Sequence, residues 1–524
     1  MSQSRRFSFE LILWLTGVIL VFGLLVFLRL NFLDTNPGWY SDEGSDLDIA
    51  RHLAQGQWQY FALGGTPLIA ARVPLFHLLL GLGFQVWGYD IATARLVVAL
   101  FSLATAGMLF IAVREMLGKW TALLTVLMFA ILPNILLYSR IAFGYNVQAF
   151  FVVVCWYALW KFYVTRARAW LVLASLAVGA AYMTALTALP LIVCVSLVVL
   201  ITKPRELTWA FLLMLAPGVV FIGLLDITAP TALFQDLALT FGRANDSMVT
   251  QLFNLTGNYV FWFDWTFWVA LGSVGLFLLP VRSARWLALL LCFSILFSTM
   301  RAFPAAGDLN LHRYLGVVPF LALGSAQFLV SAASFLGALV RADLASWRMP
   351  RGLSWLENER WQKIFVYILF VVFLIAPLSW LAMWSVYLVA FPLSPRPTRL
   401  DSVMVTNPTD ARQIVEWVNS RTADGDVVVA SPTLAWLLDA NATDFQQALA
   451  YEGIATDNYG KGLPRARFLY DVSFENAKFV ITDRLWRGWA FERMPRLKDY
   501  SQLFDSWSHV KSQGEFDVYQ NPAR

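Results

Sequence analysis

Carboxylates gather directly after the first apolar segment of the chain. Asp42 and Glu43 lie in the stretch "WYSDEG", and Asp34, Asp46 and Asp48 are close by in sequence. Three later patches carry basic or aromatic residues: "TPLIAARVPLFH", "SRIAFGYN" and "NLHRYLGVVP". A carboxylate can activate a hydroxyl or an amine, and cations can hold a phosphate that departs with negative charge. The residue types therefore suit transfer of a group from a phosphate-bearing donor, provided that the four patches meet.

The elements that must position these patches are membrane helices. Of the 524 residues, 59% are hydrophobic and 14% are charged, whereas a soluble domain carries about a quarter charged residues. Apolar runs repeat from Leu11 to about Phe391 and then stop. The first run, Leu11 to Leu28, is long enough to span a membrane and lacks a small-residue cleavage site, so we interpret it as a retained anchor. We predict a membrane domain over 1–391 and a non-cytoplasmic α/β domain over 392–524.

Ten further apolar segments predict about eleven spans in total. They lie near 96–113, 120–138, 146–164, 169–186, 188–201, 208–226, 260–279, 285–300, 314–338 and 364–391. The run from Val73 to Gly88 covers only ~24 Å as a helix, against ~30 Å of hydrocarbon. We therefore interpret it as an amphipathic helix that lies on the outer face of the membrane.

The distribution of positive charge gives the orientation, because Lys and Arg concentrate in cytoplasmic loops. If 73–88 does not span, the outer loops beyond residue 110 contain only Arg140, Arg243, Arg301 and Arg313, and most other basic residues lie inside. If 73–88 spans, most of these basic residues would instead lie in outer loops. We therefore expect an acidic first outer loop over 31–95, with the loops at 227–259 and 301–313 and the C-terminal domain on the same, non-cytoplasmic side. A multi-pass protein of the prokaryotic plasma (inner) membrane fits this pattern.

Charge and cysteine usage exclude other classes. The net charge of +5 reflects basic inner loops, and no basic stripe interleaves with aromatic residues outside the membrane, so no nucleic-acid partner is expected. Cys155, Cys194 and Cys292 all fall in apolar spans, so neither a disulfide framework nor a thiolate metal cluster is expected.

Several motifs together resemble one enzyme family. An Asp-Glu pair follows the first span, "VPLFH" follows downstream, an Arg opens the next span in "ATARLVVALFSLATAGMLF", and "REMLGKWTALLTVLMFAILPNILLYSRIA" comes after it. This combination resembles the C-type (GT-C) membrane glycosyltransferases, and within them the branch of the protein O-mannosyltransferases and the bacterial lipid A aminoarabinose transferase. The resemblance covers roughly residues 10–165 and "HRYLGVVPFL" at the start of a late span.

The resemblance implies inverting transfer of a sugar from a polyprenyl-phosphate donor to a protein, lipid or glycan acceptor at the outer face of the bilayer, with no cofactor. Asp42 would be the catalytic carboxylate, with Glu43 as a second candidate. Arg72 matches the basic residue that neutralises the donor phosphate in the family. This sequence has "RVP" where the family usually has Lys-Pro-Pro, and Asn146 where many relatives carry an acid.

Further residues are candidates for donor or acceptor contacts. Arg313 and Arg140 are additional phosphate-binding candidates. The candidates for substrate contacts are Tyr40, His312, Tyr314 and Asn146.

Structural interpretations compete with several of these roles. Glu43 also suits the start of a helix, where the helix dipole favours an acid, and Arg140 also suits a helix cap. Asp46 and Asp48 fit the first turn of a helix "DLDIARHLAQG" beyond the site. His77 and His312 fit hydrogen-bonded interface residues, because no His, Asp or Glu cluster has the spacing of metal ligands. We predict no metal site, although the sequence leaves a metal requirement open.

The C-terminal region changes pattern at Pro408. "PTDARQIVEWVN" predicts an amphipathic helix, the consecutive valines at 427–429 and "AKFVITD" predict buried strands, and "GEFDVYQNP" predicts an edge strand. No G-x-G-x-x-G or P-loop follows a strand, so no nucleotide site is expected. The domain suits a lid, an acceptor-contacting module or a purely structural role.

Three other functions fit parts of the sequence. A multi-pass transporter would show inverted repeats and ionisable residues at mid-membrane, and we find neither. A lipid-linked glycan polymerase or ligase shares the outer-face chemistry but usually has its large loop late in the chain. A non-catalytic membrane sensor would carry its function in the C-terminal domain.

Overall fold

The computed structural model describes residues 3–65, 72–242, 263–302, 311–341, 371–390, 403–456, 458–460 and 463–524, with a few single positions between 361 and 369. Most of the chain up to residue 390 is helical, as predicted. The helices of this bundle are α1 (Gln3–Leu30), α4 (Ile91–Leu117), α5 (Lys119–Ile131), α6 (Pro133–Tyr138), α7 (Gly144–Thr165), α8 (Arg168–Thr184), α9 (Leu191–Thr202), α10 (Leu207–Thr228), α13 (Phe263–Phe277), α14 (Arg282–Ala302), α15 (Val318–Arg341) and α17 (Ala376–Ala390).

Among the described residues, six helical segments are long and apolar enough to cross a membrane. They are Phe9–Leu30, Ile91–Leu117, Gly144–Thr165, Pro204–Thr228, Arg282–Thr299 and Arg313–Phe335. Other apolar helices are shorter, including α5, which ends just before Pro133 because proline disfavours helical geometry in the preceding residue. The count of eleven spans therefore stays a prediction.

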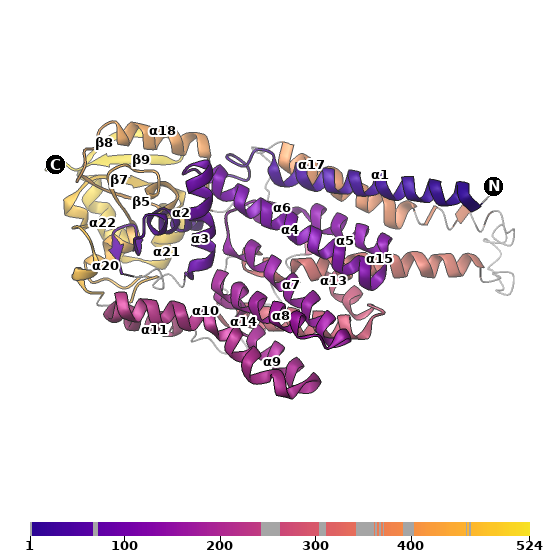
Figure 1. The fold of residues 1–524 in the computed structure, drawn as a ribbon. Coiled ribbons are helices and arrows are strands. Elements are labelled where there is room, and N and C mark those ends of the chain that lie inside the picture. The colour runs from indigo at the N-terminus through magenta and orange to yellow at the C-terminus, as the bar shows by residue number, and fades with distance from the viewer. Residues whose placement is uncertain are drawn as a thin grey trace.

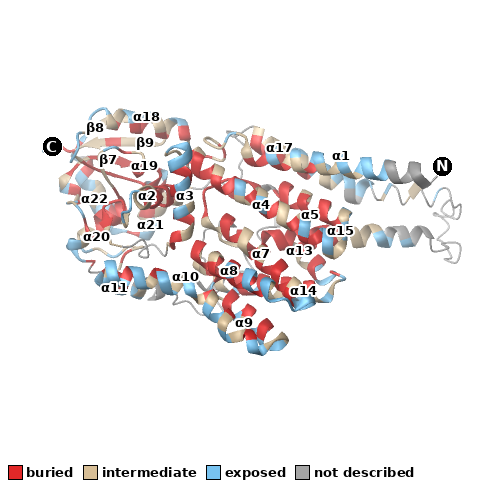
Figure 2. Ribbon diagram, in the orientation of Figure 1, coloured by how far each residue is buried: buried red, intermediate tan, exposed pale blue. Residues whose placement is uncertain are grey.

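Lipid-facing surfaces of the bundle are apolar rather than polar. In α1, Ile19 and Leu20 are 70% and 66% exposed. Figure 2 shows exposed positions along α1 and buried positions where the helices pack in the interior. Such a surface is stable in hydrocarbon, where helices satisfy their own backbone groups and apolar side chains need no partner. The chain is therefore a multi-pass membrane protein.

The long helices run side by side, and the C-terminal domain lies beyond the end of the bundle opposite the N-terminus (Figure 1). Between them lie α2 (Ser41–Ala54), the hairpin of β2 (Gln59–Tyr60) and β3 (Leu63–Gly64), and α3 (Pro74–Trp87). Helix α3 runs across the bundle instead of along it (Figure 1). It buries Phe76 and Leu80 and exposes Leu78 and Leu82. This is the pattern of an amphipathic surface helix.

The C-terminal domain is a small α/β domain, as predicted. Its sheet has the order β6-β5-β7-β9-β8, in which β6, β5 and β7 are parallel and β9 and β8 are antiparallel. The strands are β5 (Val427–Ala430), β6 (Asn441–Asp444), β7 (Ala477–Thr482), β8 (Ser508–Gln513) and β9 (Phe516–Gln520). The helices are α18 (Pro408–Asn419), α19 (Pro432–Ala435), α20 (Phe445–Tyr451), α21 (Phe491–Arg493) and α22 (Arg496–Asp505).

One strand prediction in this domain was wrong. Strand β9, from "GEFDVYQNP", is not an edge strand, because it pairs with both β7 and β8. On this side of the sheet the edge strand is β8, which joins β9 through a two-residue turn that contains Gly514 at φ 56°. The sequence of β8, "SHVKSQ", is polar and lysine-containing, as suits an exposed edge, and so it lacks the apolar alternation that marks a strand.

The first outer loop and the C-terminal domain share one interface. Strand β1 (Trp39–Tyr40) pairs with β4 (Val405–Thr406). The rings of Trp39 and Trp436 meet edge to face at 5.7 Å inside a common apolar core. A Cβ on Gly44 would lie 1.8 Å from the Pro432 carbonyl oxygen, so only glycine allows α2 to pack this closely on α19. The C-terminal domain therefore forms part of the structure that positions α2.

A second contact joins the domain to α11 (Pro230–Gly242), which lies along its lower side in Figure 1. Arg467 lies 3.3 Å from a carboxylate oxygen of the buried Asp236 and also donates to the Gly64 carbonyl at 3.0 Å. One guanidinium thus connects α11, the β2–β3 hairpin and the C-terminal domain.

Candidate active site

Helix α2 begins at Ser41, earlier than predicted. Asp42 and Glu43 occupy its first turn, where the helix dipole favours acidic side chains. The prediction that Asp46 and Asp48 lie in the first turn of the helix was wrong, because the helix begins five residues before Asp46. Asp46 lies one turn after Asp42 on the same helical face, because residues four apart are neighbours on a helix surface. The helix starts early because Glu43 accepts a hydrogen bond from the Tyr40 amide at 3.0 Å, the backbone half of a capping box.

Glu43 is enclosed by hydrogen bonds. Arg95 donates from Nε to Oε1 at 2.8 Å and from Nη2 to Oε2 at 2.6 Å. The Ala142 amide also donates to Oε1, at 2.7 Å. Glu43 and Arg95 are both fully buried. This carboxylate therefore ties α2 to the start of α4 and to the segment before α7.

Asp42 has different surroundings. Its side chain is partly exposed, and within the described part of the chain its carboxylate makes no hydrogen bond or ion pair. It lies in electrostatic range of Arg72, Tyr60 and Tyr145. Asp42 is therefore a solvent-accessible carboxyl group in electrostatic range of a guanidinium.

Asp46 joins a basic residue and a histidine. Its Oδ1 lies 3.2 Å from Arg72 Nε and 2.9 Å from His77 Nε2. His77 Nδ1 lies 3.0 Å from the Val73 carbonyl oxygen, which can only accept, so Nδ1 carries a hydrogen. The contact of Nε2 with Asp46 then needs a second proton, on either the imidazole or the carboxyl. The three side chains thus hold one another in place at the start of α3.

Arg72 keeps its charge in this setting. Burial lowers its pKa, but the carboxylates of Asp46 and Asp42 outweigh burial, and the pKa lies above its ordinary value. The side chain is 23% exposed. Its terminal Nη groups make no hydrogen bond within the described residues, so the guanidinium can present a fork to an anion.

The C-terminal domain contributes a buried carboxyl group. Tyr60 OH lies 2.9 Å from Ser45 Oγ and donates to Asp444 Oδ2 at 3.3 Å. Burial raises the pKa of Asp444 to about 6 and raises the pKa of Tyr60 well above its ordinary value. Gln447 Nε2 donates to the Tyr60 carbonyl at 2.9 Å. These bonds fix the β2–β3 hairpin against α20, next to Asp42.

Arg313 approaches the same region from the bundle. It lies in the 3₁₀ turn Leu311–Val317, which packs on α7. Its charge, like that of Arg72, acts on the phenol of Tyr145 in α7. Tyr314 follows in the same turn and is partly exposed. Tyr145 is therefore within electrostatic range of Arg72, Arg313 and the partly exposed Asp42.

Other candidates have structural contacts. Arg140 is fully buried and donates to the carbonyls of Leu28 and Asn31 at the end of α1, so it caps a helix other than its own. Asn146 Nδ2 donates to the Ile141 carbonyl at 3.1 Å. The side chain of His312 lies outside the described residues.

Tyr40 is buried, with its ring against Phe143 at 5.1 Å between ring centroids.

We call the residues that come together around Asp42 and Arg72 the polar cluster. Its members are Asp42, Asp46, Tyr60, Arg72, His77 and Tyr145, with Arg313 beside them.

Sequence reasoning did not identify every member. Asp46 had a usable signal, the four-residue spacing from Asp42. Tyr60 and Tyr145 carry no local signal, and neither does Asp444, which contacts Tyr60, because only the packing of distant segments brings these residues together. Within the described residues, no group of three or more His, Cys, Asp or Glu is arranged to hold a metal ion.

The fold is that of the C-type membrane glycosyltransferases, and the resemblance seen in the sequence is confirmed. The family described as dolichyl-phosphate-mannose-protein mannosyltransferase matches residues 71–228. The structure of ArnT from Cupriavidus metallidurans bound to undecaprenyl phosphate is similar with a TM-score of 0.61 and 16% identity, covering 98% of each chain. The structure of the apo state of the same protein is similar with a TM-score of 0.58 and 16% identity, again covering 98% of each chain.

A third similar structure is the apo oligosaccharyltransferase from Archaeoglobus fulgidus. The TM-score is 0.55 at 12% identity, over 97% of this chain and 74% of that chain. Comparison with curated protein sequences gives no match. At these identities the structural similarity defines the fold, and the chemistry must be argued from the residues.

Proposed function

We propose that the protein is an inverting glycosyltransferase that moves a sugar from a polyprenyl-phosphate donor to an acceptor at the non-cytoplasmic face of the plasma membrane. The observation that carries the proposal is the pair of Asp42 and Arg72. A partly exposed carboxylate without a partner among the described residues lies in electrostatic range of a guanidinium whose fork is available to an anion. ArnT, which shares the fold, binds undecaprenyl phosphate, and this supports a polyprenyl-phosphate donor.

In this mechanism Asp42 removes the proton from an acceptor hydroxyl or amine. The acceptor atom attacks the anomeric carbon of the donor sugar, and the bond from that carbon to the phosphate oxygen breaks. The electron pair leaves with the polyprenyl phosphate, and a single displacement inverts the anomeric centre. Arg72 and Arg313 stabilise the departing charge, which is the main electrostatic demand of the transition state.

The remaining residues support this reaction. Asp46 and His77 orient Arg72, and Glu43 with Arg95 positions the first turn of α2. We assign the transfer to a membrane domain over 1–391 and a positioning role to the domain over 392–524. The acceptor is a protein, a lipid or a glycan.

The transporter alternative gains no support from the polar cluster. Its charged groups lie near the end of the bundle that faces the C-terminal domain, whereas a transporter is expected to bind its substrate at the membrane midplane. Arg29 is buried within α1, but it donates to Ser102 Oγ and to the Phe129 carbonyl and so serves helix packing.

The test is a transfer assay with purified protein and a radiolabelled polyprenyl-phosphate sugar, in which label leaves the donor lipid. Asp42→Asn should lower turnover by 10²–10⁴-fold, the usual cost of losing a positioned general base. Donor binding should persist, because Arg72 and Arg313 remain.

Asp34→Asn is the control, since Asp34 belongs to the same loop, is partly exposed and pairs with Arg412 at 3.6 Å, outside the polar cluster. It should keep wild-type turnover. If Asp42→Asn keeps wild-type turnover while Glu43→Gln is inactive, the catalytic carboxylate is Glu43. Full activity of both variants would contradict the proposed function.

A further inference from the structure

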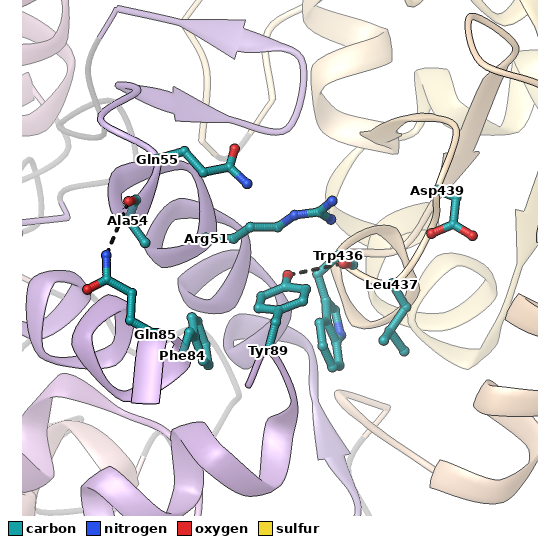
Figure 3. Close-up of a pocket in the computed structure, with 9 residues that line it drawn as sticks. All are labelled: Arg51, Ala54, Gln55, Phe84, Gln85, Tyr89, Trp436, Leu437 and Asp439. Atoms are coloured by element: carbon teal, nitrogen blue, oxygen red, sulfur yellow. Dashed lines mark hydrogen bonds between the residues drawn. The ribbon is translucent and has the colours of Figure 1, made fainter. Parts of the chain in front are cut away.

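A pocket of about 490 Å³ lies where the C-terminal ends of α2 and α3 meet the C-terminal domain (Figure 3). Its apolar lining comes from Phe84 of α3 and from Trp436 and Leu437 of the C-terminal domain. Tyr89 OH donates to the Trp436 carbonyl at 3.1 Å and so joins the two sides. The volume is within the range of small-molecule sites in proteins.

Polar side chains of opposite charge reach this pocket from its two sides. Arg51 extends from α2 over the ring of Tyr89, with its guanidinium carbon 5.1 Å from the ring centroid. Asp439 of the C-terminal domain lies on the other side in Figure 3, and no ion pair joins it to Arg51. The carboxamides of Gln55 and Gln85 add groups that both donate and accept.

We propose that this pocket binds one uncharged, hydroxyl-rich sugar unit. Sugar hydroxyls both donate and accept hydrogen bonds, so they can pair with the donor-only Arg51, the acceptor-only Asp439 and the carboxamides at once. The carbon face of a sugar ring can lie against Phe84 and Leu437. An anionic headgroup fits less well, because Asp439 would repel the charge that Arg51 attracts.

The position of the pocket assigns the sugar to the acceptor. Arg51 follows Asp42 by nine residues on α2, which is about 13 Å along the axis and two and a half turns, so it lies on the other side of the helix. The transferred sugar must have its anomeric carbon beside the acceptor atom at Asp42, so it cannot lie in this pocket, whereas an acceptor of several sugar units can reach both places. The inference rests on the proposed function and makes the acceptor a glycan or a glycan-bearing molecule.

The experiment is saturation-transfer NMR of neutral methyl glycosides with the full chain in detergent. The wild type should give a signal. Arg51→Ala and Asp439→Ala should each weaken binding about tenfold or more, because hydrogen bonds to charged groups contribute that much. Asp424→Ala, another exposed Asp of the same domain, is the matched control and should bind as the wild type does.

Binding should also persist in Asp42→Asn, since the two sites are separate. Loss of glycoside binding in Asp42→Asn would show that the probe occupies the transfer site and would overturn the inference. So would absence of a wild-type signal, or equal binding by Arg51→Ala, Asp439→Ala and wild type at unchanged melting temperatures.

Inorganic phosphate tests the anionic alternative. If phosphate displaces the glycosides and binds more tightly to Asp439→Ala than to the wild type, the ligand of the pocket is an anionic headgroup and not a neutral sugar. Because binding is measured without transfer, the result is independent of the radiolabel assay. If the protein binds glycosides but transfers no sugar, the proposed function is overturned, while the assignment of the pocket as a neutral-sugar site stands.

Discussion

Asp42 and Glu43 are adjacent on α2 and have opposite surroundings. Glu43 is buried and accepts four hydrogen bonds, two of them from Arg95. Asp42 is partly exposed and has no such partner among the described residues. A carboxylate whose acceptor positions are occupied cannot easily take a proton from a substrate. Under the proposed function, we therefore expect Asp42 to act as the general base and Glu43 to position the first turn of α2.

We expect Glu43→Gln to act mainly on stability. The amide removes the charge that compensates Arg95 in a fully buried position, and breaking a buried ion pair typically costs about 3–5 kcal/mol. Thermal unfolding of the purified protein should show a clear fall in melting temperature. Asp42→Asn, the neighbouring change on a partly exposed side chain, should melt as the wild type does. A Glu43→Gln protein of normal stability without turnover would instead give Glu43 a chemical role.

If Arg72 binds the donor phosphate, as proposed, substitutions at this position should lower donor affinity by graded amounts. Lys keeps the positive charge but lacks the forked geometry of the guanidinium, so Arg72→Lys should bind donor more tightly than Arg72→Ala. Loss of a charge-assisted hydrogen bond costs about 1.5–3 kcal/mol, or roughly 10–100-fold in affinity. The same pair of changes at Arg313 tests the second cation. If neither alanine variant differs from wild type in donor affinity, neither residue contacts the phosphate.

At the scale of elements, the C-terminal domain fixes the position of α2. The Ser41 amide donates to the Met404 carbonyl at 2.9 Å, directly after the β1–β4 pairing. Gly44 then packs on the Pro432 carbonyl. Figure 2 shows α2 as a buried helix between the domain and the bundle. The domain is therefore part of the scaffold of the polar cluster.

Asp444 gives this interface a pH dependence with a defined sign. Burial raises its folded-state pKa to about 6, whereas the unfolded value is about 3.9. Between these values the folded protein binds more protons than the unfolded chain, so this group lowers stability as pH rises from about 4 to 6, by at most about 3 kcal/mol. Above about pH 6 its effect is constant.

Asp444→Asn removes this titration and keeps a residue that caps α20 well. The melting temperature of the wild type minus that of the variant should fall from pH 4 to 6 and then level off. Thermal unfolding of both proteins across this range measures the difference. Groups that titrate in both proteins, such as Glu515, whose pKa burial raises to about 7, contribute equally to both melting temperatures and so do not affect it. Parallel curves for the two proteins would contradict the assignment.

At the scale of the whole molecule, the first outer loop, α3 and the C-terminal domain lie at one end of the bundle (Figure 1). The basic residues of the sequence predict that this end is non-cytoplasmic. A reporter that is active only in the exported compartment should therefore be active when fused after Arg524. Fusion after Lys119, in a predicted inner loop, is the control and should be silent. The reverse result would mean that α3 crosses the membrane.

The sequence by itself determined the membrane class, the C-terminal α/β domain and the family resemblance. These properties depend on local information: apolar runs, strand and helix periodicity, and short motifs around Asp42 and Arg72. Element boundaries were less certain, because the start of α2 depends on where Glu43 finds its partners. Strand β8 was missed since a polar edge strand has no apolar alternation.

Only the tertiary structure decided how the individual side chains are used. Nothing near Glu43 in the sequence indicates that Arg95, 52 positions away, encloses it. The bond from Tyr60 to Asp444 joins residues separated by 384 positions, and the pocket between Arg51 and Asp439 has its two walls in different domains. Such relations arise from the packing of distant segments, and burial then determines which carboxylate is compensated and which remains accessible to solvent.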